Sequence, residues 1–253
     1  MSVTVAPLPR GMGRETRARR AAREALAAVI WNPDGTRRLP SERALLSAIE
    51  ACDRRDLWWV CEASSAGPVY QLPTREWVRA LARFVTKVKA RTVLEVAAGD
   101  GFVSACLARA LPAVKVVATD DHSWKRPAAR MNDADRTEFA GVDFAGITPA
   151  PTVQRMAATA AVTRYAPDLT LVVWAPPGSL VRRVVRAERS SLVLDLGVDG
   201  FTGDTSAWRY RKEFLEGPLV TRALCRLDAR PSEGRATHAT LYYGRAHPDH
   251  GVE

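Results

Sequence analysis

The sequence predicts an α/β protein with a mostly parallel sheet, an antiparallel hairpin at its C-terminal end and a helical extension at its N-terminal end. Three observations predict this fold. From residue 91 onward, short apolar stretches typical of buried strands alternate with helical patterns. Strands that alternate with helices imply right-handed crossovers and a sheet covered on both faces. With 253 residues, the chain has room for one large domain and a smaller appendage.

The N-terminal part is expected to lie outside the α/β domain. Residues 1–13 contain two prolines and two glycines and are expected to form a disordered tail. The helical extension is expected to cover residues 14–68. Within it we predict an Arg- and Ala-rich helix over 14–30 and, after a turn, a second helix capped by Ser41.

The α/β domain is expected to span residues 69–246, with a short tail over 247–253. A helix that begins at Thr74 and runs to about Lys89 precedes the first strand. The predicted strands cover residues 92–96, 114–119, 152–156, 169–174, 191–196, 220–227 and 238–243. The last two are expected to form the antiparallel pair. Helices are predicted over 101–111, up to Tyr165, and over 180–186.

The chain is basic, with a net charge of +9, and the excess is uneven. Residues 1–45 contain nine arginines and four acids, which gives +5 for that segment. A basic arm over residues 10–43 is suited to gripping the phosphates of RNA. The alternative is an Arg/Ala-rich helix whose charged face is simply solvated.

The cysteines and the hydropathy exclude several classes of protein. Cys52, Cys61, Cys106 and Cys225 form no CxxC pair and have no histidine at ligand spacing. We therefore expect buried reduced thiols and no metal site. No apolar run approaches the roughly 20 residues that span a bilayer, and no signal-peptide pattern follows the N-terminal arginines. We expect a cytoplasmic protein with no membrane partner.

The turn after the first predicted strand is the strongest indication of function. It reads Glu95-Val-Ala-Ala-Gly-Asp-Gly101, and its small residues at Ala97, Gly99 and Gly101 let a ligand approach the main chain. In an open α/β sheet, ligands lie beyond the carboxyl ends of the strands. The turn departs from the G-x-G-x-x-G pattern of dinucleotide sites. Glu95 would repel a pyrophosphate but would pair with an ammonium group.

These residues resemble the first motif of class I S-adenosylmethionine (SAM)-dependent methyltransferases, with Ala97 in place of the usual first glycine. The resemblance covers about residues 70–245 and implies a Rossmann-like class I methyltransferase fold with SAM as cofactor. It also implies that Asp120, at the end of the second strand, binds the ribose hydroxyls. This class often has Asp or Asn near the adenine amino group, where this chain has Ala157. We expect the adenine to rest there on an apolar surface.

The segment after the fourth strand is expected to face the sulfonium and the methyl acceptor, as it does in this class. It makes Trp174 a candidate cofactor contact and Pro176 a candidate substrate contact. The segment partly resembles the Asn/Asp-Pro-Pro-aromatic motif of enzymes that methylate base amines. Ala175 and Gly178 replace the polar and the aromatic residue of that motif, which argues against this mechanism. By their position before the domain, Tyr70 and Gln71 are candidate SAM contacts.

The candidate general bases are His122, Asp121 and Glu62, and methyl transfer requires no metal. Asp121 is also a second candidate for the ribose hydroxyls. The glycine-rich loop after the fifth strand is expected to be mobile and to bring Phe201 and Trp208 over the acceptor.

Three functions follow from these observations. We expect a methyltransferase that acts on an O or N atom of a small molecule, such as a natural product. The first alternative is a ribosomal RNA methyltransferase of the antibiotic-resistance type. It is favoured by the basic arm and by a loose likeness of residues 177–181 to the fourth-strand loop of those enzymes. The second alternative is a protein of this fold that binds SAM without transferring a methyl group, or an oxidoreductase with a degenerate dinucleotide loop.

Overall fold

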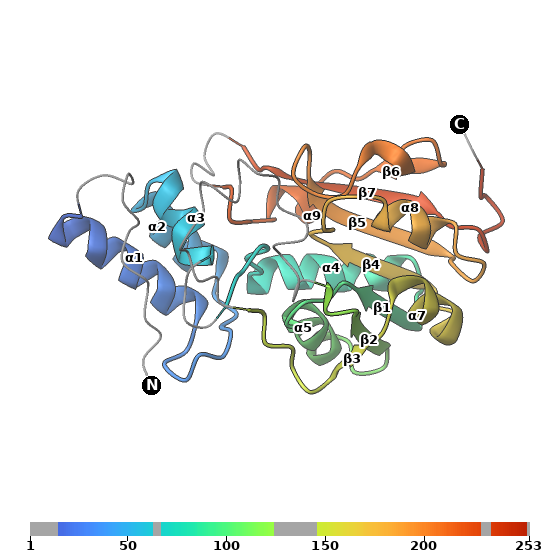
Figure 1. The fold of residues 1–253 in the computed structure, drawn as a ribbon, viewed down its shortest axis with the longest axis horizontal. Coiled ribbons are helices and arrows are strands. Elements are labelled where there is room, and N and C mark those ends of the chain that lie inside the picture. The colour runs from blue at the N-terminus through green and yellow to red at the C-terminus, as the bar shows by residue number, and fades with distance from the viewer. Residues whose placement is uncertain (1–14, 63–66, 124–145, 229–233, 252–253) are drawn as a thin grey trace.

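A computed structural model describes residues 15–62, 67–123, 146–228 and 234–251 (Figure 1). Its centre is a seven-stranded sheet with the strand order β3-β2-β1-β4-β5-β7-β6. The strands are β1 (Thr92–Val96), β2 (Lys115–Asp120), β3 (Val153–Arg155), β4 (Leu169–Val173), β5 (Leu192–Val198), β6 (Lys212–Phe214) and β7 (Thr237–Tyr243).

The pairing confirms the predicted fold class. The first five strands pair in parallel, and β7 is antiparallel to both β5 and β6. In the register, Val96 lies opposite Thr119 of β2 and Val172 of β4. The carboxyl ends of β1, β2 and β4 therefore meet at one edge of the sheet, where a ligand is expected.

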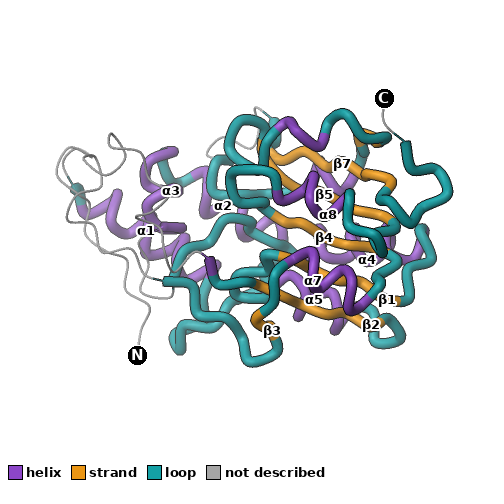
Figure 2. Tube along the Cα trace, turned by 45° about the vertical axis from the view of Figure 1, so that its right-hand side comes forward, coloured by secondary structure: helices purple, strands orange, loops and turns teal. Residues whose placement is uncertain are grey.

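Helices cover both faces of the sheet (Figure 2). One face packs against α4 (Arg75–Lys87), α5 (Phe102–Ala110) and α9 (Pro218–Thr221). The other packs against α7 (Ala158–Tyr165), α8 (Leu180–Val185) and the 3₁₀ helix η3 (Thr205–Ala207). Apolar residues at alternate positions of the strands belong to one core or the other, because successive side chains of a strand point to opposite faces of the sheet.

The N-terminal helices form a third core beside the sheet (Figure 1). It consists of α1 (Arg17–Ile30), α2 (Glu42–Glu50) and α3 (Arg54–Glu62). The predicted cap is present, because the Ser41 hydroxyl accepts a hydrogen bond from the Ala44 N–H group. The core also includes Leu72 and Leu224, so the extension packs against the segment that leads into the α/β domain.

Two elements differ from the sequence prediction. The predicted strand Val220–Leu227 is wrong, since β6 takes its place as the partner of β7. Residues 218–221 form α9 because Gly217 precedes it with a φ of +82° and Pro218 opens the helix, where its missing N–H group costs nothing. Helix α3 was not predicted at all.

The described residues bear on the predicted state of the cysteines and on the hydropathy of the helices. All four cysteines are buried and free, which confirms the expected buried thiols. In the described ranges, no helix combines the length and the apolar character needed to cross a bilayer.

Candidate functional site

A cavity of about 480 Å³ lies at the carboxyl ends of β1, β2 and β4. We call it the cofactor cavity. Most of the residues predicted for the site line it: Tyr70, Gln71, Glu95, Ala97, Gly99, Asp120, Asp121, Ala157, Trp174 and Pro176. The fold therefore brings together residues that are up to about a hundred positions apart in the sequence.

The turn between β1 and α5 has the backbone shape that its small residues predicted. Ala97, Gly99 and Gly101 all have positive φ angles, of 52°, 56° and 76°. Gly101 caps α5 rather than lining the cavity, and a Cβ atom there would lie 2.4 Å from Cγ2 of Val153. At Gly99 a Cβ atom would meet nothing closer than 3.8 Å. Gly101 is thus required for packing, whereas Gly99 leaves room in the cavity because it has no side chain.

Asp120 closes this turn against the end of β2. Its Oδ2 atom accepts a hydrogen bond of 2.9 Å from the Gly99 N–H group, and its Oδ1 atom accepts one of 2.7 Å from the His122 N–H group. Each carboxylate oxygen has a second lone pair, so the group can still accept from a diol in the cavity. Asp120 therefore holds the loop in shape as well as lining the cavity.

Glu95 lies at the base of the cavity and is 2% exposed. Both the N–H and the hydroxyl group of Ser104 donate to its Oε2 atom. Burial raises the pKa of Glu95 to about 7, although the hydrogen bonds from Ser104 oppose that rise. A cationic group in the cavity would favour the ionised form, so this carboxyl is poised to respond to an ammonium.

Arg37 enters the cavity from the N-terminal extension, and sequence reasoning missed it. Its Nη1 atom lies 2.9 Å from Oδ2 of Asp100, and its guanidinium group lies 4.6 Å from the centre of the Phe102 ring. Its Nη2 atom donates to the carbonyl oxygen of Gln71. The Nε–H group of Arg37 is buried without a hydrogen-bond partner among the described residues. The Arg37 guanidinium group thus ties the extension to the turn between β1 and α5, and its Nε–H group remains without a partner in the described residues.

Gln71 is the second buried group with unused hydrogen-bonding capacity. It lines the cavity, is 6% exposed, and neither end of its side-chain amide has a partner in the described part of the chain. Its neighbours fix the backbone, since Leu72 N–H donates to Leu224 and the Tyr70 carbonyl accepts from Arg226. An unsatisfied buried amide is costly, and this one lies at the cavity with both ends unused in the described residues.

Trp174 and Tyr70 form an aromatic wall beside the end of β4. Their ring centroids lie 5.7 Å apart and the rings are stacked. Trp174 adopts a positive φ of 60°, and its N–H group donates to the Leu196 carbonyl oxygen. The guanidinium group of Arg226, which is 3% exposed, lies 5.0 Å from the centre of the Tyr70 ring. Tyr70 is therefore packed between the Trp174 ring and a buried cation.

The opposite end of the cavity is apolar. Ile147, Met156 and Ala157 line it next to Asp120. This is the surface on which the adenine was expected to rest.

Of the candidate bases, His122 and Asp121 lie away from the aromatic wall, whereas Glu62 lies close to Tyr70 through its pair with Arg226. His122 follows β2, has a φ of 58° and does not line the cavity. The ends of β2 and β4 are two strands apart, which is roughly 10 Å. Asp121 does line the cavity, beside Asp120 at the β2 end. Glu62 is paired with Arg226 and does not line the cavity. The described geometry thus gives no support to a base among these three at the β4 end.

The aromatic residues of the loop after β5 lie outside the cavity. Phe201 and Trp208 are 55% and 48% exposed. The loop nevertheless lies beside the β4 end, because Gly203 N–H donates to the Ala175 carbonyl oxygen at 3.1 Å. Closure of this loop over an acceptor stays a prediction.

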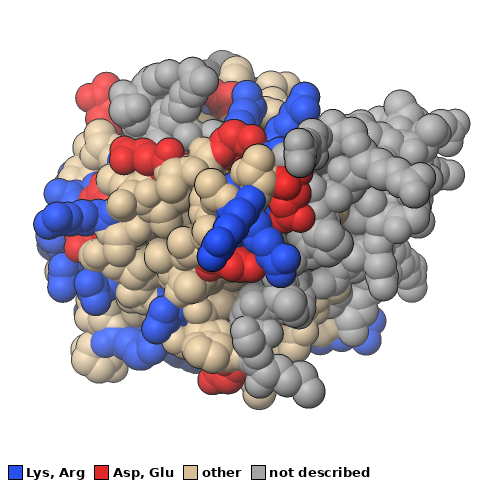
Figure 3. All heavy atoms as spheres, turned by 90° about the vertical axis from the view of Figure 1, so that its left-hand side faces the viewer, with Lys and Arg blue, Asp and Glu red and all other residues tan. Residues whose placement is uncertain are grey.

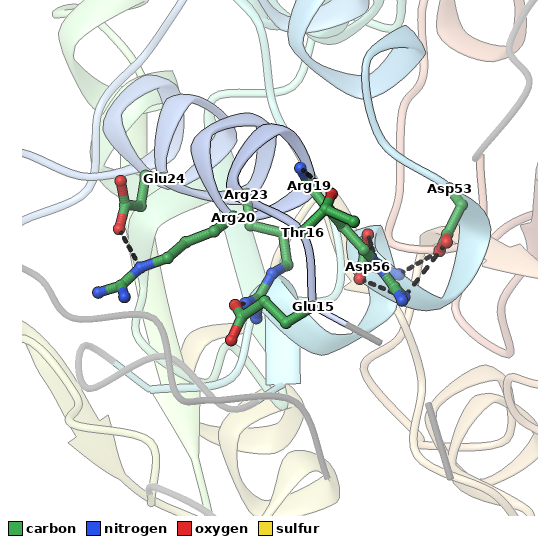
Figure 4. Close-up of polar contacts among 8 residues, drawn as sticks. All are labelled: Glu15, Thr16, Arg19, Arg20, Arg23, Glu24, Asp53 and Asp56. Carbon is green, nitrogen blue, oxygen red and sulfur yellow. Dashed lines mark hydrogen bonds and ion pairs between the residues drawn. The ribbon is translucent and has the colours of Figure 1, made fainter. Parts of the chain in front are cut away.

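The predicted basic arm is partly neutralised by acids of the extension itself (Figure 4). Arg19 forms two hydrogen bonds of 2.7 and 2.8 Å to the buried Asp56, and Arg23 pairs with Glu15. Arg20 pairs with Glu24 on the surface. On the face presented by the N-terminal helices, acidic side chains lie among the basic ones (Figure 3). Of these three arginines, Arg19 ties α1 to α3, and all three have part of their charge offset by a neighbouring acid.

No protein-family model and no curated protein matches the chain. Several solved structures do match at low identity. They include the methyltransferase domain of bacterial CtHen1 (11% identity over 67% of this chain and 98% of that chain, TM-score 0.38). A putative O-methyltransferase from Klebsiella pneumoniae matches at 16% identity (68% and 81% of the chains, TM-score 0.38). The 23S rRNA methyltransferase ErmE matches at 16% identity (67% and 69%, TM-score 0.34). With TM-scores below 0.5, these likenesses carry no argument about this chain. Its fold is described by its own strand order, and its function is inferred from its own residues.

Proposed function

We propose that this protein is a SAM-dependent methyltransferase that binds its cofactor in the cofactor cavity. The observation that carries the proposal is the turn after β1. Its carboxylate at Glu95 and its link from Gly99 to Asp120 form an acidic cradle that suits an ammonium and a diol. A pyrophosphate would meet the carboxyl groups of Glu95 and Asp120 at close quarters and would be repelled when they are ionised.

The cavity suggests a place for each part of the cofactor. The adenine would lie on Met156 and Ala157, and the ribose hydroxyls would reach Asp120. The ammonium of the amino acid portion would lie toward Glu95. We assign the carboxylate of that portion to the Nε–H group of Arg37 and the side-chain amide of Gln71, which have no hydrogen-bond partner in the described residues.

Methyl transfer is then a matter of position. The sulfonium would lie toward the aromatic wall of Tyr70 and Trp174, whose ring faces attract a cation. The acceptor would enter beside Pro176, in line with the sulfur–methyl bond. We propose that the described residues at this end of the cavity act by orienting the acceptor.

The acceptor is proposed to be an O or N atom of a small molecule, such as a natural product, that stacks on the aromatic wall. A nucleotide of RNA would present a planar group to the same wall. An RNA acceptor is favoured more by the exposed arginines near the C-terminal end of α8 than by those of the N-terminal arm.

Calorimetry tests the proposal. We expect S-adenosylhomocysteine (SAH) to bind at one site and NAD to give no heat. Heat from NAD alone would contradict the proposal and favour an oxidoreductase. Transfer of label from radioactive SAM to an acceptor would then separate an enzyme from a protein that only binds the cofactor.

A further inference from the structure

A second cavity, also of about 480 Å³, lies on the α8 face of the sheet and is lined by cationic side chains. We call it the basic cavity. Its lining residues are Arg186, Arg209, Tyr210, Arg245 and His250. They come from three places in the chain: the C-terminal end of α8, the turn before β6 and the segment after β7. The fold, rather than a local run of charge, brings these guanidinium groups together.

The segment after β7 is fixed to the body of the protein. Arg245 N–H donates to the Val185 carbonyl oxygen at 3.0 Å. A Cβ atom on Gly244 would lie 2.6 Å from the Ser190 carbonyl oxygen, so only glycine allows this close approach. The Nδ1 atom of His250 lies 2.8 Å from the carbonyl oxygen of Tyr243. Arg245 and His250 are therefore positioned on a docked backbone.

The three arginines of the basic cavity have no acidic partner among the residues that the structure describes. Within the described ranges, the side chains of Arg186, Arg209 and Arg245 make no hydrogen bond and no ion pair. Asp249, four residues beyond Arg245, is paired with Arg211 instead. Like charges that share one concave surface repel each other, and a bound anion removes that cost.

A purely local role accounts for only part of this arrangement. Arg186 is the C-cap residue of α8, where a cation interacts favourably with the helix dipole. Neither Arg209 nor Arg245 lies at the end of that helix. All three arginines are exposed, so it is their clustering on one concave surface, and not burial, that a local role leaves unexplained.

We propose that the basic cavity binds phosphate groups of a nucleic-acid strand and guides that strand toward the cofactor cavity. Guanidinium groups match phosphate oxygens in geometry and charge. Helix α8 joins the two sites, since Ser179 and Arg183 line the cofactor cavity and Arg186 lines the basic cavity. The rise from Ser179 to Arg186 is roughly 10 Å, which corresponds to about three nucleotides of one strand. The link to methyl transfer rests on the proposed function, whereas binding of the strand does not.

The test measures the binding of a fluorescein-labelled uridine 12-mer to the full chain by fluorescence anisotropy. The titration is repeated over a range of salt concentrations. The variant carries Arg186→Ala, Arg209→Ala and Arg245→Ala together. In a plot of log K against log salt the slope is negative, and the loss of three phosphate contacts should make it shallower by about 2. The affinity at 0.1 M salt should fall roughly 100-fold.

A matched control removes the same charge from the opposite face of the sheet. Arg75, Arg79 and Arg83 are exposed along α4 and are replaced by Ala together. We expect the slope of this control to stay close to that of the wild type. Equal losses in both variants would show a response to net charge alone and would overturn the proposal, as would uridine monophosphate binding as tightly as the 12-mer, or no binding of the 12-mer at all.

Calorimetry with SAH separates this inference from the proposed function. The triple variant of the basic cavity is expected to bind SAH like the wild type. If the wild type binds the 12-mer but not SAH, the methyltransferase proposal fails and the nucleic-acid site stands.

Discussion

Replacement of Arg37 by Met should weaken binding of the cofactor's amino acid portion and leave the adenosine portion unaffected. Arg37 belongs to the extension, yet its side chain is only 13% exposed and reaches Asp100 in the turn between β1 and α5. Met keeps most of the apolar stem and removes the guanidinium group. A hydrogen bond to a charged group contributes about 1.5–3 kcal/mol, so the dissociation constant for SAH should rise roughly 10- to 150-fold.

The assay is isothermal titration with two ligands. SAH carries the amino acid portion, whereas 5′-methylthioadenosine keeps the adenosine and the sulfur but lacks that portion. We expect the Arg37→Met variant to lose affinity for SAH only. Arg38→Met is the matched control, because Arg38 is exposed and its side chain bonds only within the extension. Equal weakening of both ligands would mean that Arg37 merely shapes the loop, and the carboxylate assignment would be refuted.

Three further changes test other parts of the site. Asp120→Asn keeps one of the two loop acceptors but loses the charge, so SAH should bind at least about tenfold more weakly; unchanged affinity by calorimetry would refute the ribose assignment. Because the pKa of Glu95 is raised to about 7, its burial should lower stability as pH rises from about 4.5 to 7, by up to about 3 kcal/mol. Urea unfolding at pH 5 and pH 8 should show that Glu95→Gln lacks this loss, and an identical pH dependence in both proteins would contradict it. Gly101→Ala should cost about 2–4 kcal/mol through its positive φ and its clash with Val153; Val153→Ala should recover part of that cost, and strict additivity in urea unfolding would argue against the clash.

The local parts of the fold and the site were predictable from the sequence. Strand β1 and the turn after it were predicted because a short apolar run is typical of a buried strand and a series of small residues is typical of a tight turn. Asp120 was found for the same reason, since it ends an apolar strand. Its second role, as acceptor for the Gly99 and His122 N–H groups, depends on the pairing of β1 with β2 and leaves no local pattern.

The parts that depend on distant contacts were not predictable. Arg37 looked like one member of a basic arm, and only the packing of the extension shows that it reaches Asp100, 63 residues away. The segment 220–227 has enough β-branched and apolar residues to suggest a strand, but its neighbours Gly217 and Pro218 start a helix instead. The Arg186, Arg209 and Arg245 cluster is invisible in the sequence because its members lie in three separate segments.

The central claim is that the turn after β1 receives a positively charged amino acid portion and not a diphosphate. A crystal structure of the SAH complex tests it most directly. The claim predicts the amino group toward Glu95, the carboxylate at Arg37 and the sulfur facing Trp174. Soaks that leave this cavity without an adenosyl sulfur compound, or that place a nicotinamide dinucleotide in it, would contradict the claim.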